Sequence, residues 1–238
     1  NKWTKFSIKE IVDPNDKYSL TGGPFGSDLK SSEYTNKGIR IIQLQNIGDG
    51  EFKDNYKIYT SNEKANSLSS CKIYSGEIIL SKMGDPVARA TLIPKHLKTC
   101  LMASDGIRLK VDEKRFDKKF ILEKINAPSF RSQAETVSTG TTRKRIGLQS
   151  LKELTLDIPP LPEQKKIAEI LSGIDKLINL KVEKLDKSKI FSFALVDKLF
   201  SSNHFEFVSL SDIAEIVRGK FSHRPRNDPD FYGGNYPF

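Results

Sequence analysis

The sequence predicts an α+β protein, in which a globular domain of mixed short strands and helices is followed by a long α-helix that can form a coiled coil. Three observations predict it. Residues 1–157 mix short β-rich stretches with polar turns, residues 158–162 contain three prolines, and residues 162–200 carry an apolar seam at helical spacing. We therefore expect a domain, a stiff connector and a helix, in that order.

The composition is that of a globular protein with a real core. The chain has 238 residues, of which 37% are hydrophobic and 29% charged, enough for one large or two ordinary domains. No stretch approaches the ~18 apolar residues of a membrane span, and the first twenty residues hold no signal-peptide core. We expect a cytoplasmic protein without a membrane partner.

Three stretches of the domain have a recognisable periodicity. The segment "IRIIQLQNI" at 39–47 alternates as a strand does, and "GEIILSKMG" at 76–84 is a β-rich run bounded by glycines. Residues 117–136 have helical periodicity that is interrupted at Pro128. The first two stretches therefore predict strands, and the third predicts a helix with a break.

The proline step "IPPLP" at 158–162 cannot be helical, because proline fixes φ and pushes the residue before it to extended geometry. Pro162 can occupy the first turn of the following helix, where its missing N–H is not needed, and Glu163 favours the positive end of the helix dipole. The step therefore predicts a helix start at about residue 162.

An apolar seam at spacings of three and four runs along residues 162–200, which would span roughly 58 Å at ~1.5 Å per residue. Seven of its eleven positions are apolar, and Gln164, Lys181, Ser188 and Ser192 are polar. The predicted helix–helix contacts are Ile167, Leu171, Ile174, Ile178, Leu185, Leu195 and Leu199. A single amphipathic helix lying on a globular core fits the periodicity equally well; the length favours a coiled-coil spacer, because average helices have about 11–12 residues.

The end of the chain repeats its beginning. "KFSIKEIV" at 5–12 aligns with "FVSLSDIA" at 207–214 at an offset of 202 residues, and "EYTNKGIRI" at 33–41 resembles "FYGGNYPF" at 231–238. A period of this size indicates a duplicated domain. We expect residues 205–238 to open a second, truncated copy of the first domain.

Positive charge is concentrated in the first domain. The chain has a net charge of +9, and residues 1–161 hold 27 Lys and Arg against 19 Asp and Glu, while residues 162–200 hold 8 against 6. A basic domain beside a nearly balanced helix fits a nucleic-acid binder, because Lys and Arg contacts to phosphates supply most non-specific affinity.

Catalytic and cofactor motifs are missing from the sequence. It has no Gly-x-x-x-x-Gly-Lys-Ser/Thr loop and no glycine-rich cofactor turn, and its three histidines are isolated. Cys71 and Cys100 form no Cys-x-x-Cys pair, which indicates buried free thiols. We expect no catalytic residue, no metal and no cofactor.

Polar and basic side chains of the first domain are suited to DNA. Gln and Asn can bond adenine in a bidentate manner, Arg and Lys bond guanine, and glycine-rich turns let the backbone approach phosphates. The loop "STGTTRKRIG" at 138–147 is the best phosphate contact, although an ordinary solvated turn is an alternative, as is a hydrogen-bonded edge strand for residues 43–46. The predicted DNA-binding residues are Gly23, Phe25, Ser27, Lys30, Gln43, Gln45, Asn46, Lys82, Arg89, Arg143, Lys144 and Arg145.

These parts, in this order, resemble the specificity (S) subunits of type I restriction-modification systems. The resemblance runs along the whole chain through "WTKFSIKEIV", "GGPFGSDLK", "YTNKGIRIIQLQNI" and "GEIILSKMG", in which Glu77 replaces the usual Asp. The most specific element is the Pro-Pro-Leu-Pro-Glu-Gln core of "STGTTRKRIGLQSLKELTLDIPPLPEQKKIAEILSGID".

The resemblance implies that residues 1–157 are a target recognition domain, that 158–200 are the proline step and first conserved spacer helix, and that 205–238 begin a second recognition domain. Such a subunit is not an enzyme. It reads one half of a split site in double-stranded DNA, its helices pack antiparallel, and partner methyltransferase (M) and restriction (R) subunits methylate adenine or cleave.

One recognition domain and one helix leave the apolar seam without an internal partner, so we expect a homodimer through antiparallel helices. Two alternatives are a stand-alone dimeric DNA-binding protein and the recognition portion of a fused restriction or methylation enzyme.

Overall fold

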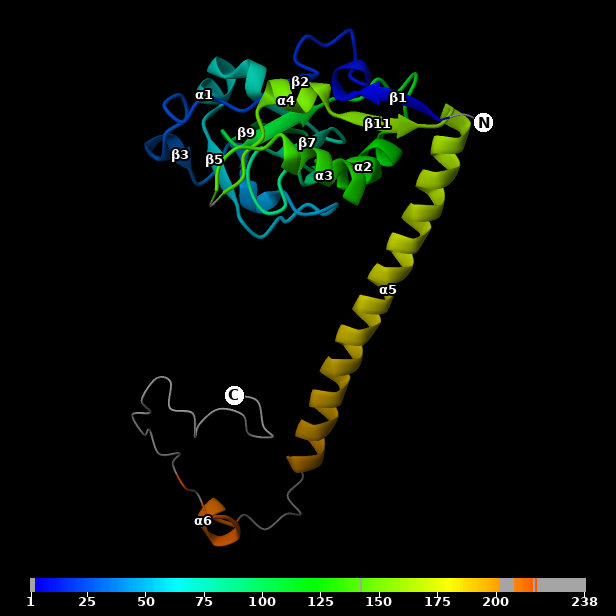
Figure 1. The fold of residues 1–238 in the computed structure, drawn as a ribbon. Helices are drawn as coiled ribbons and strands as arrows, with labels where there is room; N and C mark the ends of the chain where they lie inside the picture. The colour runs from blue at the N-terminus through cyan, green and yellow to red at the C-terminus, as the bar shows by residue number, and fades with distance from the viewer. Residues whose placement is uncertain (1–2, 142, 202–207, 216, 218–238) are drawn as a thin grey trace, which may run out of the picture. The chain divides into compact units, whose positions relative to one another are not determined.

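The computed structural model describes residues 3–141, 143–201, 208–215 and 217 (Figure 1). The first and last strands of the globular part close it, because β1 (Thr4–Ser7) pairs antiparallel with β11 (Thr155–Ile158). Phe6 lies opposite Leu156 in this ladder, and both pack on the main core. The pairing sets the point at which the chain leaves the domain for the helix.

A four-stranded antiparallel sheet lies at the centre of the domain, with the order β2-β10-β7-β8. Ile78 and Leu80 of β7 pack on the core that contains Phe120, whereas Ile79 points to the other face and packs with Ile42. Both faces are therefore buried. The strands are β2 (Leu20–Gly22), β7 (Ile78–Ser81), β8 (Ala90–Leu92) and β10 (Gly106–Leu109).

Helices α2 (Lys118–Asn126) and α3 (Pro128–Thr136) cover the first face of this sheet (Figure 1). Asp117 caps α2 by accepting a hydrogen bond from the backbone N–H of Phe120 at 2.9 Å. Pro128 occupies the first turn of α3, so the predicted helical stretch with a break at this proline is confirmed.

A five-stranded sheet of order β3-β5-β4-β9-β6 packs on the second face, and its pair β4 and β9 is parallel. The predicted strand at 39–47 ends at Ile42, because residues from Leu44 form a 3₁₀ turn, whereas the strand predicted within 76–84 is confirmed as β7. The strands are β3 (Tyr34–Thr35), β4 (Ile39–Ile42), β5 (Ile58–Thr60), β6 (Lys72–Tyr74) and β9 (Thr99–Met102).

Short helices connect the strands. They are the 3₁₀ turns η1 (Ile8–Glu10), η2 (Ser31–Glu33), η3 (Leu44–Asn46) and η4 (Ser69–Cys71), and the helices α1 (Asn62–Ser67) and α4 (Leu148–Glu153).

A buried arginine joins the central sheet to the N-terminal loop. Arg108 is 3% exposed and donates through Nη2 to Glu77 Oε1 at 2.6 Å and to Asp16 Oδ2 at 2.8 Å. Burial raises the cost of the charge, and the two carboxylates offset it. Glu77, part of the β-rich motif, therefore has a structural role.

The helix α5 (Leu161–Phe200) begins one residue before the predicted start, so the prediction that the whole step 158–162 is non-helical is wrong for Leu161 and Pro162, which form the first turn of the helix. Gln164 is 1% exposed; its Oε1 accepts from the Asp117 backbone N–H at 2.8 Å, and its Nε2 donates to the Pro159 carbonyl at 2.9 Å. Trp3 Nε1 donates to Glu163 Oε1 at 3.1 Å. Gln164 was predicted as a polar position of the seam, and it is instead the side chain that anchors the helix start to the domain.

The chain divides into two compact units, residues 1–179 and 180–238, and the boundary lies inside α5. In the second unit α6 (Leu210–Ile213) follows Ser209, as η1 follows Ser7 in the first unit at the predicted offset of 202 residues. Most of the predicted second domain, 205–238, including the "FYGGNYPF" match, lies outside the described residues.

Candidate nucleic-acid interface

Four of the twelve predicted DNA-binding residues line one groove of about 560 Å³. Gln43 and Gln45 come from the segment after β4, Arg89 precedes β8, and Arg143 lies in the loop at 138–147. The other lining residues are Tyr34, Leu44, Met83, Ala103, Ser104 and Asp105. Segments that are far apart in the sequence therefore meet at a polar surface.

The turn η3 presents the two glutamines. Asn46 Oδ1 accepts from the Gln43 backbone N–H at 3.0 Å, and Asn46 Nδ2 donates to the carbonyls of Lys53 and Tyr56 at 2.8 and 2.9 Å. Asn46 is fully buried, its amide is used within the domain, and it does not line the groove. Gln43 Nε2 donates to the Tyr34 hydroxyl at 3.2 Å, and the Gln45 side chain is exposed.

The basic loop is a short hairpin. The backbone N–H groups of Thr139 and Arg145 donate to each other's carbonyls at 2.9 and 2.8 Å. Gly140 has φ +97°, a conformation that favours glycine, and a Cβ there would lie 2.7 Å from the Arg143 carbonyl oxygen. Ile146, buried just beyond the hairpin, donates its backbone N–H to the Lys82 carbonyl at 2.9 Å, which fixes the loop to the end of β7.

The three consecutive basic residues of the hairpin have different surroundings. All three are exposed; Lys144 Nζ lies 3.5 Å from Glu135 Oε2. Arg145 Nη2 lies 3.0 Å from Asp105 Oδ1, an ion pair whose angles are not those of a hydrogen bond. Arg143 lines the groove and forms no ion pair with any of the described residues, so its guanidinium is the best placed of the three for a phosphate.

The glycine-rich turn lies next to this surface rather than in it. A Cβ on Gly23 would lie 1.8 Å from the Ala103 carbonyl oxygen, and the Gly23 backbone N–H donates to the Gly106 carbonyl at 2.8 Å. Gly23 therefore has a packing role. Phe25 is 83% exposed, and Ser27 and Lys30 are exposed as well. None of these side chains lines the groove.

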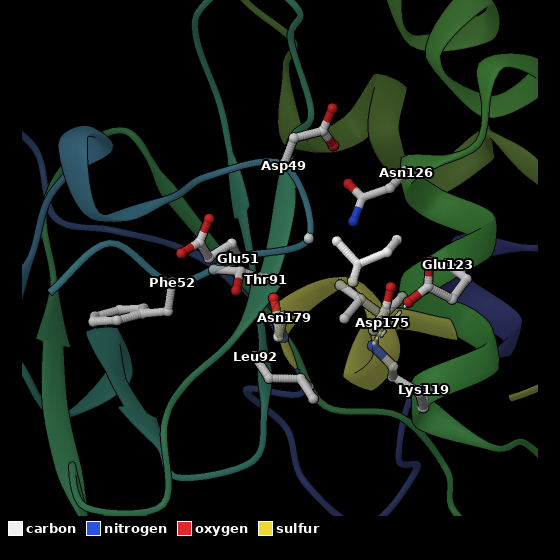
Figure 2. A pocket seen from close by; sticks show the side chains of 13 residues that line it. Asp49, Glu51, Phe52, Thr91, Leu92, Lys119, Glu123, Asn126, Asp175 and Asn179 are labelled. Carbon is white, nitrogen blue, oxygen red and sulfur yellow. Dashed lines mark hydrogen bonds and ion pairs between the residues drawn. The ribbon is translucent and has the colours of Figure 1, made fainter. Parts of the chain in front are cut away.

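The charged side chains of a second hollow, of about 690 Å³, are mainly acidic, in contrast to the groove with Arg89 and Arg143 (Figure 2). Asp49, Glu51, Glu123 and Asp175 line it with a single cation, Lys119. Burial lowers the pKa of Lys119, but ion pairs with Glu123 at 2.9 Å and Asp175 at 3.2 Å outweigh it and raise the pKa above its ordinary value. Carboxylates repel phosphates, so this hollow is not suited to DNA.

Within the residues that the structure describes, no group of three or more His, Cys, Asp or Glu side chains could hold a metal ion. Cys71 and Cys100 are free and buried, and burial raises the pKa of Cys100 to about 12, so this thiol is not a nucleophile at neutral pH. None of the described helices is long and apolar enough to cross a membrane.

Sequence reasoning did not single out Tyr34, Ser104 and Asp105 as DNA-contact candidates. Strands β4 and β9 run parallel as neighbours, with Ile42 opposite Met102, so the residues that follow the two strands emerge on the same side of the sheet. The glutamines after β4 therefore meet the turn 103–106 after β9. Pairing between strands about sixty residues apart leaves no local signal in the sequence.

Comparisons with known proteins agree with this architecture. The model of the type I restriction modification DNA specificity domain matches residues 1–188. The specificity subunit of the type I restriction enzyme MjaVIII from Methanocaldococcus jannaschii is 24% identical over 84% of this chain and 47% of that protein. The EcoBI specificity subunit from Escherichia coli is 26% identical over 73% of this chain and 32% of that protein. The chain thus spans about half, or less, of the length of these curated relatives.

Solved structures show the same fold. The type I restriction-modification S subunit from M. genitalium superposes with a TM-score of 0.56 at 20% identity, over 86% of this chain and 47% of that one. The HsdS subunit from Thermoanaerobacter tengcongensis gives a TM-score of 0.52 at 13% identity, over 87% and 52%. The predicted α+β domain with a long helix is confirmed. With the family model covering most of its length, the chain belongs to the type I restriction modification DNA specificity domain family.

Proposed function

We propose that this chain is a non-catalytic DNA-recognition subunit of a type I restriction-modification complex, acting in the cytoplasm. The groove with Gln43, Gln45, Arg89 and Arg143 carries the proposal, because it joins base-reading amides to phosphate-binding guanidinium groups. Lys82 lies next to it and the hairpin residues Lys144 and Arg145 extend its basic rim. In this proposal M and R subunits carry out methylation and cleavage.

Mapping of methylated adenines across the host genome, with and without the gene, tests this function. One split motif should lose its methyl groups in the deletion strain and regain them on complementation. If every motif survives deletion while the purified chain still binds one DNA site, a stand-alone dimeric DNA-binding protein replaces the proposal. A catalytic motif in the same polypeptide would support the recognition portion of a fused enzyme.

We further propose that two copies associate through antiparallel α5 helices, so that two recognition domains read an inverted repeat. The apolar positions of α5 support this: Ile174, Ile178, Leu185 and Leu195 are 46–56% exposed in the single chain, whereas Ile167 and Leu171 are partly buried. Exposed apolar area of this extent is costly in water. A solution mass of twice 26.9 kDa is expected at micromolar concentration, and a mass of 26.9 kDa would contradict it.

A further inference from the structure

Three buried polar atoms without a hydrogen-bond partner in the described chain lie at one end of the central sheet. They are Ser81 Oγ, Arg89 Nε and Asp105 Oδ1; the other two such atoms are Arg40 Nε and Arg131 Nε. Ser81 ends β7 opposite Gly106, and its backbone N–H donates to the Arg89 carbonyl at 2.7 Å. Buried polar atoms are usually paired with protein groups, ordered water or a ligand, so this cluster, where Arg89 and Asp105 line a groove, has hydrogen-bonding capacity that the chain itself does not use.

Asp105 is the one acidic side chain among the residues that line this groove. It occupies the turn Ala103–Gly106, which is closed by a 3.1 Å hydrogen bond from the Gly106 N–H to the Ala103 carbonyl. Its own backbone carbonyl accepts from the Lys82 N–H at 2.6 Å, and its side chain is 20% exposed. Arg145 neutralises the carboxylate without using Oδ1 in a hydrogen bond. Oδ1 is buried beside Arg145, so the exposed part of the carboxylate is the part that a base at the groove can reach, and its position is fixed.

A carboxylate next to DNA selects one kind of base edge. In the major groove cytosine N4 and adenine N6 present amino donors, whereas guanine O6 and thymine O4 present acceptors that a carboxylate repels. Gln43 lies in the same groove and uses one amide hydrogen on Tyr34, so its Oε1 is a second acceptor. Arg89 and Arg143 supply the positive charge that allows an acidic side chain to approach phosphates.

We propose that Asp105 is a specificity-determining residue that accepts a hydrogen bond from the exocyclic amino group of an adenine or cytosine in the recognised half-site. This inference rests on the proposed DNA-recognition function. The competing structural role is that Asp105 only holds the hairpin through Arg145. That role predicts a loss of stability on substitution with no change in base preference.

Selection of bound duplexes from a randomised DNA library, using the full chain, separates the two roles. Wild type should select a motif with adenine or cytosine at one position, and Asp105→Ala should lose the preference at that position alone, by about tenfold or more. Glu63→Gln removes an exposed carboxylate of α1 outside the groove and should leave the motif unchanged. If Asp105→Ala does not fold, Asp105→Leu, which keeps the bulk of the side chain and has no acceptor, takes its place.

Duplexes in which the selected base lacks its amino group complete the test: purine replaces adenine, or pyrimidin-2-one replaces cytosine. Wild type should lose about tenfold in affinity for the analogue and the Asp105 variant should lose nothing. An unchanged motif in a folded Asp105 variant would overturn the inference and leave the recognition function intact. Wild type that selects no motif at all would overturn both.

Discussion

The globular part of the chain buries most of its large apolar side chains, whereas the helix α5 exposes most of its own. Among the described residues, every buried apolar side chain except Ala168 lies between Ile8 and Ile158. In α5 only Gln164 and Ala168 of forty residues are buried, and fourteen large hydrophobic side chains from Ile170 to Phe200 are exposed. The domain buries most of its apolar side chains without a partner, whereas the helix has exposed apolar surface that a partner can cover.

The two regions also differ in how they use charge. The domain buries Arg40, Arg108 and Arg131 at 3–8% exposure against carboxylates and carbonyls. The described ion pair within the distal part of α5, Lys187 with Glu183 at 2.6 Å, lies between side chains that are 60–73% exposed. Buried pairs are costly to break and exposed pairs are not. Substitutions should therefore affect unfolding in the domain and association in the helix.

The largest effect is expected at Arg108. Arg108→Ala leaves Glu77 and Asp16 without their buried cation, so the free energy of unfolding should fall by about 3–5 kcal/mol. Urea denaturation followed by circular dichroism measures it. Lys187→Ala, which breaks an exposed pair of α5, should leave the urea midpoint almost unchanged. Equal losses of unfolding free energy for the two variants would contradict the difference between buried and exposed ion pairs.

The helix is tested next, through association. Ile174→Ala and Leu185→Ala remove seam residues that are 48% and 56% exposed, so they should barely change the unfolding of a dilute monomer. Each should weaken dimerisation by about 2 kcal/mol, measured by sedimentation over a concentration series. Ile121→Ala, in the core of the domain, is the control, and it should lower the free energy of unfolding by about 2–5 kcal/mol.

Gln164 connects the start of α5 to the domain, so its substitution tests whether this contact holds the first turns of the helix on the domain. Gln164→Leu keeps the bulk but leaves the Asp117 N–H and the Pro159 carbonyl without partners, at a cost of about 1–3 kcal/mol for each buried group. Hydrogen exchange should show faster opening of the first turns of α5. If exchange there stays as slow as in the wild type, Gln164 is not the anchor.

The sequence could predict these elements only where the signal is local. The helix start at the proline step, the break at Pro128 and the strand around Ile79 depend on neighbouring residues, and all three are present, with the helix starting at Leu161 inside the step. The end of β4 at Ile42 was missed because the alternation continues into η3, where Asn46 turns inward to bond distant carbonyls. The groove was found only in part, since the parallel pairing of β4 with β9 is a tertiary contact.

A smaller effect is expected from pH at Asp16. Burial opposes its ionisation, but the Tyr18 backbone N–H and the Arg108 guanidinium hold the pKa of Asp16 below the ordinary value of 3.8. The ionised form therefore stabilises the fold above pH 3.8, and this contribution is lost as the pH falls through the lower folded pKa. Asp16→Asn should reduce the difference in urea midpoint between pH 7 and pH 3. An unchanged difference would exclude Asp16 as a source of it.

The last prediction concerns a positive charge that should affect DNA binding and not folding. Arg143 is exposed at the groove, so Arg143→Ala should leave the free energy of unfolding unchanged. If its guanidinium contacts a phosphate, the slope of log K against log salt should become shallower by about 0.9. Lys184→Ala removes an exposed cation of α5 and is the matched control, expected to leave the slope unchanged. The salt dependence counts the phosphates that each region neutralises. A change of slope for Lys184→Ala and none for Arg143→Ala would therefore indicate that the helix, and not the domain, contacts the DNA.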